Sequence, residues 1–102
     1  MRADDYTQLA IRTATDKTDL CNCALGLTGE SGEFADHIKK HLYQGHKIDA
    51  DYLINELGDI MWYVAVAAER LGFNLSEVME INIEKLKKRY PNGFEVEKSI
   101  NR

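Results

Sequence analysis

The stretch "IMWYVAVAA" (residues 60–68) decides the fold that we predict for this chain of 102 residues. It is the longest apolar run in the sequence, and a helix that contains it is apolar on every side. Such a helix lies in the middle of a hydrophobic core rather than on a surface. The run is far too short to span a membrane. In a chain this small, we expect a second subunit to share the core around this helix.

Helices are predicted on both sides of this run, because the only proline, Pro91, lies near the end of the sequence. Asp49 and Gly72 are expected to bound the central helix, and "NLSE" (residues 74–77) is typical of a capping box that begins the next one. No alternation of period two indicates a strand. The sequence therefore predicts an all-α fold, a compact bundle of about four helices forming one domain, residues 1–102. Its expected parts are a first helix at 3–15, core helices within 18–89, and a tail at 94–102.

The composition excludes several classes of protein. A hydrophobic fraction of 44% and a charged fraction of 29% are typical of a folded globular domain. A net charge of −4 argues against nucleic acid as the main partner, because phosphate backbones require a basic surface. No apolar run follows Met1, and Cys21 and Cys23 would point to different sides of a helix. We therefore expect a cytoplasmic protein with free thiols and no membrane partner.

Three glycines interrupt the expected second helix: Gly26, Gly29 and Gly32. Each destabilises a helix by about 1 kcal/mol relative to alanine. Such a concentration suggests that another element approaches the helix backbone closely, or that the helix is bent or broken there.

Two acidic pairs with the same three-residue spacing are the main candidates for a functional site. They are Glu30 with Glu33 on the second helix, and Glu56 with Asp59 on the third. This spacing puts both carboxylates of a pair on one helix face, where they repel each other unless a cation lies between them. Residues 48–69 contain no Lys or Arg that could neutralise the second pair. Either the acids are simply solvated, or the two helices form a hard-oxygen site for Mg²⁺ or Mn²⁺.

The segments around these pairs resemble the MazG-like nucleotide pyrophosphohydrolases, which are all-α NTP pyrophosphatases. The resemblance lies in "LTGESGEFADHIKK" (residues 27–40), "NELGDIMWYVAVAAERLGF" (residues 55–73) and "NIEKLKKRYPNGF" (residues 82–94). It implies Mg²⁺-dependent hydrolysis of an NTP or dNTP to the monophosphate and pyrophosphate, with Mn²⁺ as a substitute metal. The implied metal ligands are Glu30, Glu33, Glu56 and Asp59, and either Glu30 or Glu33 is the expected general base. The chain departs from many members at Gly29, where they carry a further acid.

Substrate contacts are expected from the third and fourth helices. Asn82, Lys85 and Arg89 share one face of the fourth helix, and the resemblance implies that they contact the nucleotide and its phosphates. Lysines at the end of this helix also complement its dipole without any further role. Trp62, one turn beyond Asp59, is a candidate for stacking on the base, although a tryptophan in an apolar helix is more often part of a core.

The histidines His37 and His41 have the i,i+4 spacing of zinc ligands, but the favoured interpretation is that they face solvent at a helix end. The leading hypothesis is a nucleotide pyrophosphohydrolase that assembles as a homodimer or homotetramer. The resemblance suggests that a neighbouring subunit completes each site. The alternatives are a non-catalytic bundle that binds metal or nucleotide, and a purely structural dimerisation domain.

Overall fold

The computed structural model describes residues 1–102 and contains helices but no strand. This confirms the predicted all-α class. The elements, in chain order, are α1 (Ala3–Ala10), the 3₁₀ helix η1 (Ile11–Thr13), α2 (Leu20–Gln44), α3 (Ala50–Arg70), α4 (Leu75–Arg89) and α5 (Val96–Ile100). None of these helices is long and apolar enough to cross a membrane.

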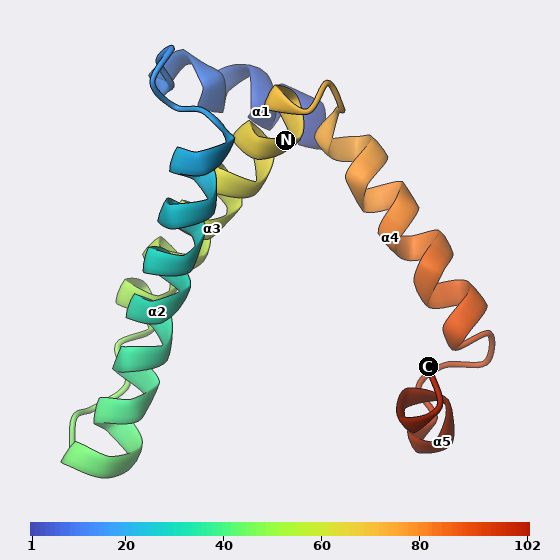
Figure 1. Cartoon of the computed structure of the whole chain (residues 1–102). Coiled ribbons are helices and arrows are strands. Elements are labelled where there is room, and N and C mark those ends of the chain that lie inside the picture. The colour runs from blue at the N-terminus through green and yellow to red at the C-terminus, as the bar shows by residue number, and fades with distance from the viewer.

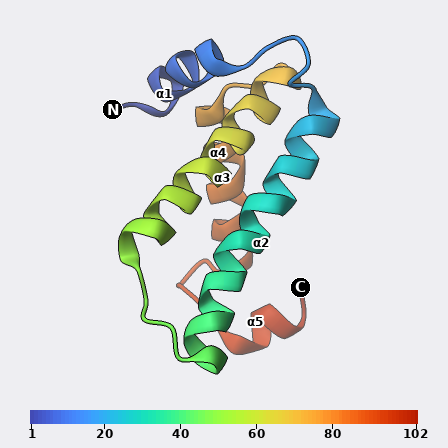
Figure 2. The same cartoon turned by 90° about the vertical axis from the view of Figure 1, so that its left-hand side faces the viewer.

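The helices form two arms that meet at one end of the molecule (Figure 1). α2 and α3 run antiparallel, side by side, and make the most extensive contact in the chain (Figure 2). α1 lies across one end of this pair, and α4 leaves from the same end as a separate arm with α5 at its tip. We call these parts the α2–α3 arm and the α4 arm.

Most helix boundaries lie where the capping signals predict them. The Asp49 carboxylate accepts a hydrogen bond from the backbone N–H of Tyr52 at 3.1 Å, so Asp49 is the N-cap of α3. Gly45 ends α2 with a φ of 72°, a conformation that glycine adopts without strain. The Asn74 N–H donates to the Glu77 carboxylate at 2.9 Å, as a capping box requires. The first helix is shorter than the predicted range 3–15, because α1 ends at Ala10 and the chain continues only as the turn η1.

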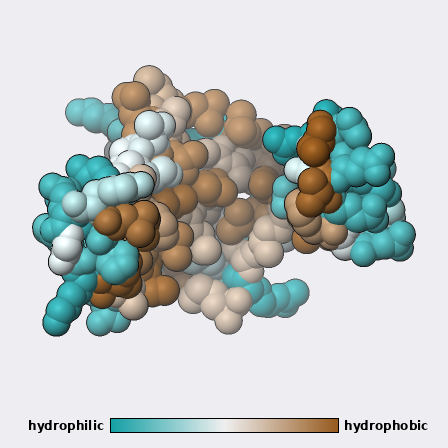
Figure 3. Space-filling view, turned by 90° about the horizontal axis from the view of Figure 1, so that it is seen from below, coloured by the Kyte–Doolittle hydropathy of each residue, from teal (hydrophilic) through white to brown (hydrophobic).

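The core of the single chain is small. Its fully buried part comes largely from the run 60–68, which contributes Ala65, Val66 and Ala68. Large apolar side chains remain exposed on both arms, among them Met61 on α3 and Met79 and Ile81 on α4. Seen from below, apolar surface (brown) gathers on the sides of the arms that face the space between them, while hydrophilic surface lies on the outer sides (Figure 3).

The glycines of α2 differ in what surrounds them. An added Cβ at Gly26 would lie 2.2 Å from the ring of Tyr63, whereas nothing lies within 4 Å of the same position at Gly29 or Gly32. α2 continues as one helix through all three glycines. The predicted close approach is therefore confirmed at Gly26, and the predicted break does not occur.

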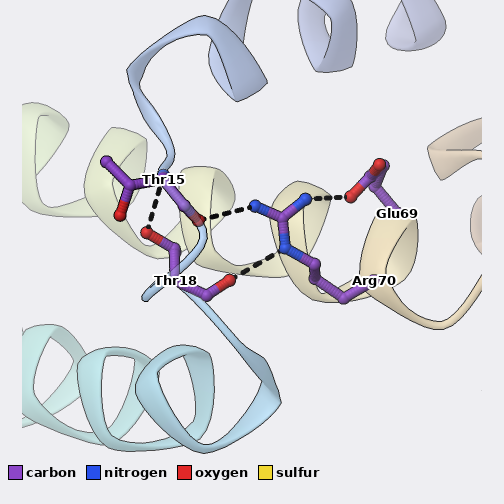
Figure 4. Close-up of polar contacts among 4 residues, drawn as sticks. All are labelled: Thr15, Thr18, Glu69 and Arg70. Carbon is purple, nitrogen blue, oxygen red and sulfur yellow. Dashed lines mark hydrogen bonds and ion pairs between the residues drawn. The ribbon is translucent and has the colours of Figure 1, made fainter.

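Polar side chains fasten the loops to the helix ends. Arg70 lies at the end of α3, where its Nε donates to the carbonyl of Thr18 at 2.8 Å and its second guanidinium nitrogen donates to the carbonyl of Thr15 at 3.2 Å (Figure 4). The same guanidinium pairs with Glu69. One side chain thereby holds the connection between η1 and α2 against α3.

A second polar contact fixes the start of the α4 arm. The Asp4 carboxylate accepts hydrogen bonds from the backbone N–H of Ser76 at 3.0 Å and from its hydroxyl at 2.6 Å. These bonds lower the pKa of Asp4. A carboxylate from α1 thus satisfies a free N–H in the first turn of α4 and ties the two helices together.

Candidate metal centre

Three of the four predicted carboxylates come together between α2 and α3. Glu30 and Glu33 on α2 and Glu56 on α3 each offer an oxygen, and these oxygens lie within 4.8 Å of one another. The three-residue spacing turns both α2 acids toward the neighbouring helix. Glu33 is exposed, Glu30 is half-buried and Glu56 is buried, with 7% of its surface exposed. The cluster is therefore open to solvent on the α2 side and closed on the α3 side.

Glu56 is the most perturbed acid in the chain. Its Oε2 atom is buried and has no hydrogen-bond partner. A hydrogen bond with Glu30, burial, and the negative charges of Glu30, Glu33 and Asp59 raise the pKa of Glu56 to about 7. None of the four ion pairs in the chain involves Glu30, Glu33 or Glu56. Burying an unpaired carboxylate beside other acids is costly, and a divalent cation would remove that cost.

The donor set fits such a cation. Three carboxylates provide the hard oxygen ligands that Mg²⁺ and Mn²⁺ prefer, and one of them, that of Glu56, has an oxygen without a hydrogen-bond partner. No nitrogen or sulfur ligand is part of this cluster. This composition favours a hard divalent ion over zinc.

Asp59 is not part of the three-carboxylate cluster. It lies one turn beyond Glu56 on α3 and is exposed. Its charge contributes to the raised pKa of Glu56. Burial is the main cause of the raised pKa of Tyr6 on α1, and the charge of Asp59 is the second cause. Asp59 therefore lies between the cluster and α1, and its role as a ligand stays a prediction.

Trp62 fastens α3 to the N-terminal segment. Its indole N–H donates to the Thr13 hydroxyl at 2.9 Å and to the Ala10 carbonyl at 3.2 Å. The indole also meets the ring of Tyr63 edge-on, with centroids 5.0 Å apart. These contacts give Trp62 a packing role, and its stacking on a base stays a prediction.

The predicted nucleotide contacts Asn82, Lys85 and Arg89 lie on the α4 arm (Figure 1). α4 packs on α1 and α3 near the junction of the arms and then diverges from α2. A single chain therefore does not bring these three side chains to the carboxylates of the α2–α3 arm.

An aromatic pair next to the carboxylates was missed by the sequence interpretation. The ring of His37 stacks on that of Tyr52 with centroids 5.0 Å apart, and its Nε2 accepts the backbone N–H of Asp49 at 3.0 Å. Burial, followed by the nearby charges of Glu56, Glu33 and Asp36, raises the pKa of Tyr52. The available signal was the spacing: His37 follows Glu33 by one turn, and Tyr52 precedes Glu56 by one turn.

The histidines do not form a metal site. His37 uses Nε2 for the Asp49 bond, and His41 directs Nδ1 to the carbonyl of His46 at 2.8 Å. These local contacts hold the loop between α2 and α3. His37 is half-buried, and besides facing solvent its ring stacks on the exposed Tyr52 of α3.

The chain is similar to known proteins over most of its length. Residues 20–94 match the model of a family described as "MazG nucleotide pyrophosphohydrolase domain". The "Gene 37 protein" of Mycobacterium phage L5 is 42% identical over 73 residues, which cover 68% of this chain and 64% of the phage protein. The alignment thus spans less than two thirds of that relative's length. No solved structure matches the chain.

Proposed function

Because this chain belongs to the family of MazG nucleotide pyrophosphohydrolase domains, we propose that it hydrolyses an NTP or dNTP to the monophosphate and pyrophosphate in a Mg²⁺-dependent reaction. The bond broken is the one between the α- and β-phosphates. The observation that carries this proposal is the buried, unpartnered oxygen of Glu56 facing two further carboxylates. We further propose that residues 1–102 form one such domain and that it acts in the cytoplasm.

Glu30, Glu33 and Glu56 are the residues that would hold the metal, with Asp59 as a fourth ligand. When bound, Mg²⁺ or Mn²⁺ supplies charge neutralisation for the phosphate chain and lowers the pKa of a water molecule. Glu56 must lose its proton to become a ligand, so metal binding releases a proton near neutral pH.

The exposed Glu33 is the best placed of the three acids to accept a proton from an attacking water. Its carboxylate reaches solvent while its neighbours are more buried. Glu30 is the alternative base, although it is more buried than Glu33. General-base catalysis requires a carboxylate within hydrogen-bond reach of the water, which a solvent-facing member of the cluster satisfies best.

The substrate-binding half of the site is proposed to come from a second subunit of a homodimer or homotetramer. Asn82, Lys85 and Arg89 lie on the α4 arm, away from the carboxylates of their own chain. The apolar surface between the arms supports association of copies, because large exposed apolar patches mark interaction sites. In such an assembly, the basic α4 of one subunit would face the acidic α2–α3 arm of another. Trp62, which is half-buried, is the proposed stacking partner of the base.

The test is release of pyrophosphate from a panel of NTPs and dNTPs with Mg²⁺, comparing the native chain with Glu56→Gln. This substitution keeps the shape of the side chain but removes the buried charge that would bind the metal. We expect release to fall by about 100-fold or more, since even changes in the outer shell of a metal site cost 10- to 100-fold. Glu95→Gln is the matched control, because Glu95 lies outside the cluster and makes no ion pair.

Thermal unfolding with and without Mg²⁺ separates the alternatives. A chain that Mg²⁺ stabilises but that releases no pyrophosphate is a non-catalytic metal- or nucleotide-binding bundle, consistent with the absence of an acid at Gly29. A chain that shows neither effect is a structural dimerisation domain with solvated carboxylates.

A further inference from the structure

A polar hollow lies between α4 and α5, at the tip of the α4 arm. It has a volume of about 590 Å³, and no apolar residue lines it. Its walls carry five cationic side chains, Lys85, Lys88, Arg89, Lys98 and Arg102, and one acidic side chain, Glu97. This concentration of positive charge occurs in a chain whose net charge is −4.

None of the cations that line this hollow takes part in an ion pair, although Lys85 and Lys88 also line an adjoining hollow with Glu80 and Glu84. The ion pairs join Lys39 and Lys40 to Asp36, Arg70 to Glu69, and Lys87 to Glu84. Lys87 lies between the lining residues Lys85 and Lys88 in the sequence but does not line the hollow, and it has a carboxylate partner. Like charges gathered around one hollow repel one another, and a bound anion would relieve that repulsion.

We infer that this hollow binds a condensed phosphate, either the phosphate chain of a nucleotide or free pyrophosphate, and that Lys98 and Arg102 of the α5 segment are ligands beside Lys85 and Arg89. This inference rests on the proposed function, because it names where the phosphate chain docks. Arginine can bind two phosphate oxygens at once through its planar fork, while lysine acts as a mobile point charge. A hollow with both residue types suits an anion that carries several charges.

The α5 segment lies beyond the residues that match the family. The family match ends at residue 94, so Lys98 and Arg102 lie outside the matched segment. The turn after α4 brings them to the α4 cations, and Tyr90 and Phe94 pack at this turn with ring centroids 5.4 Å apart. The guanidinium of Arg89 lies 6.0 Å from the centroid of the Tyr90 ring, a cation–π contact that orients it.

The experiment is calorimetric titration of pyrophosphate into the full chain in EDTA, so that neither metal binding nor hydrolysis contributes. The variant is Lys98→Glu with Arg102→Glu. The matched control is Lys17→Glu with Lys47→Glu, which changes the net charge equally at exposed sites on the other arm. We expect the affinity to fall about tenfold in the variant, and about twofold or less in the control, where distance and salt screen the charges.

Two results would overturn the inference. One is an equal loss of affinity in variant and control, which would indicate a general charge effect. The other is weakened binding of a single-stranded oligonucleotide in the variant while binding of pyrophosphate and of an NTP is unchanged. If the variant loses affinity equally for pyrophosphate and for NTP, the ligand is the phosphate chain in either source. If the variant loses affinity for NTP alone, the ligand is the nucleotide.

The same titrations distinguish failure of this inference from failure of the proposed function. A native chain that hydrolyses nucleotides, but whose affinities for pyrophosphate and for an NTP are both unaffected by the two reversals, retains the function and loses the inference. A native chain that hydrolyses nothing, but binds pyrophosphate through Lys98 and Arg102, retains the anion site and loses the enzyme.

Discussion

Replacing Gly26 with alanine tests the packing of α2 against α3. The added Cβ would lie 2.2 Å from two atoms of the Tyr63 ring and 2.7 Å from a third. Carbon atoms pack at about 3.5–4.0 Å, so the ring must retreat by more than about 1 Å. The ring is half-buried and packs edge-on against Trp62, so it cannot move away without losing contacts.

Two opposing terms set the magnitude. Overpacking of this kind destabilises a protein by about 1–3 kcal/mol, while replacing a helical glycine by alanine stabilises it by about 1 kcal/mol. The two terms leave a net destabilisation of up to about 2 kcal/mol. For a chain of this size, a loss of about 2 kcal/mol lowers the melting temperature by about 8–16 °C.

The assay is thermal and urea unfolding followed by circular dichroism, at one protein concentration because association changes apparent stability. Gly32→Ala is the matched control, since its Cβ would meet no atom of the chain. We expect this control to be more stable than the native chain by up to about 1 kcal/mol. A second comparison makes Gly26→Ala in a Tyr63→Ala background, where the alanine should become neutral or stabilising.

Equal stability of Gly26→Ala and Gly32→Ala would contradict a clash with the Tyr63 ring. A loss of stability that persists in the Tyr63→Ala background would also contradict it, because the three atoms nearest to the added Cβ all belong to that ring. A loss at Gly32 instead would mean that another surface packs on this part of α2, as in an assembly of several copies.

Three further outcomes follow from polar contacts. Arg70→Lys is expected to lower the free energy of unfolding by about 1–2 kcal/mol in urea titrations, because lysine cannot reach both carbonyls of the loop; an unchanged midpoint would contradict this. In EDTA, the folded pKa of Glu56 lies above its ordinary value of 4.5, so the protonated acid favours the native state. Its contribution to stability is full below about pH 4.5 and is lost as the pH rises through about 7, and the profile of Glu56→Gln should lack this fall. The pKa of Asp4 is lowered, so its contribution is present above 3.8 and is lost as the pH falls below that value. Asp4→Asn should speed hydrogen exchange in the first turn of α4, and unchanged exchange there would contradict the role of the Ser76 bonds.

Local features of this protein could be predicted from the sequence alone. The all-α class and the caps at Asp49 and Gly45 depend on hydrogen bonds and backbone angles within one turn of the residue concerned. The pairing of Glu30 with Glu33 also depends only on helical spacing. Their meeting with Glu56 was one of two alternatives that the sequence left open, and the family resemblance favoured it.

Contacts between distant residues were decided only by the tertiary structure. The Trp62 indole donates hydrogen bonds to Thr13 and Ala10, which lie 49 and 52 positions earlier in the sequence. No local pattern indicates such a partner. The cationic hollow forms because the turn after α4 folds α5 back against it. A helix's own sequence specifies which residues share a face, but the element that covers each face is selected by packing with residues far along the chain, so only the assembled structure reveals it.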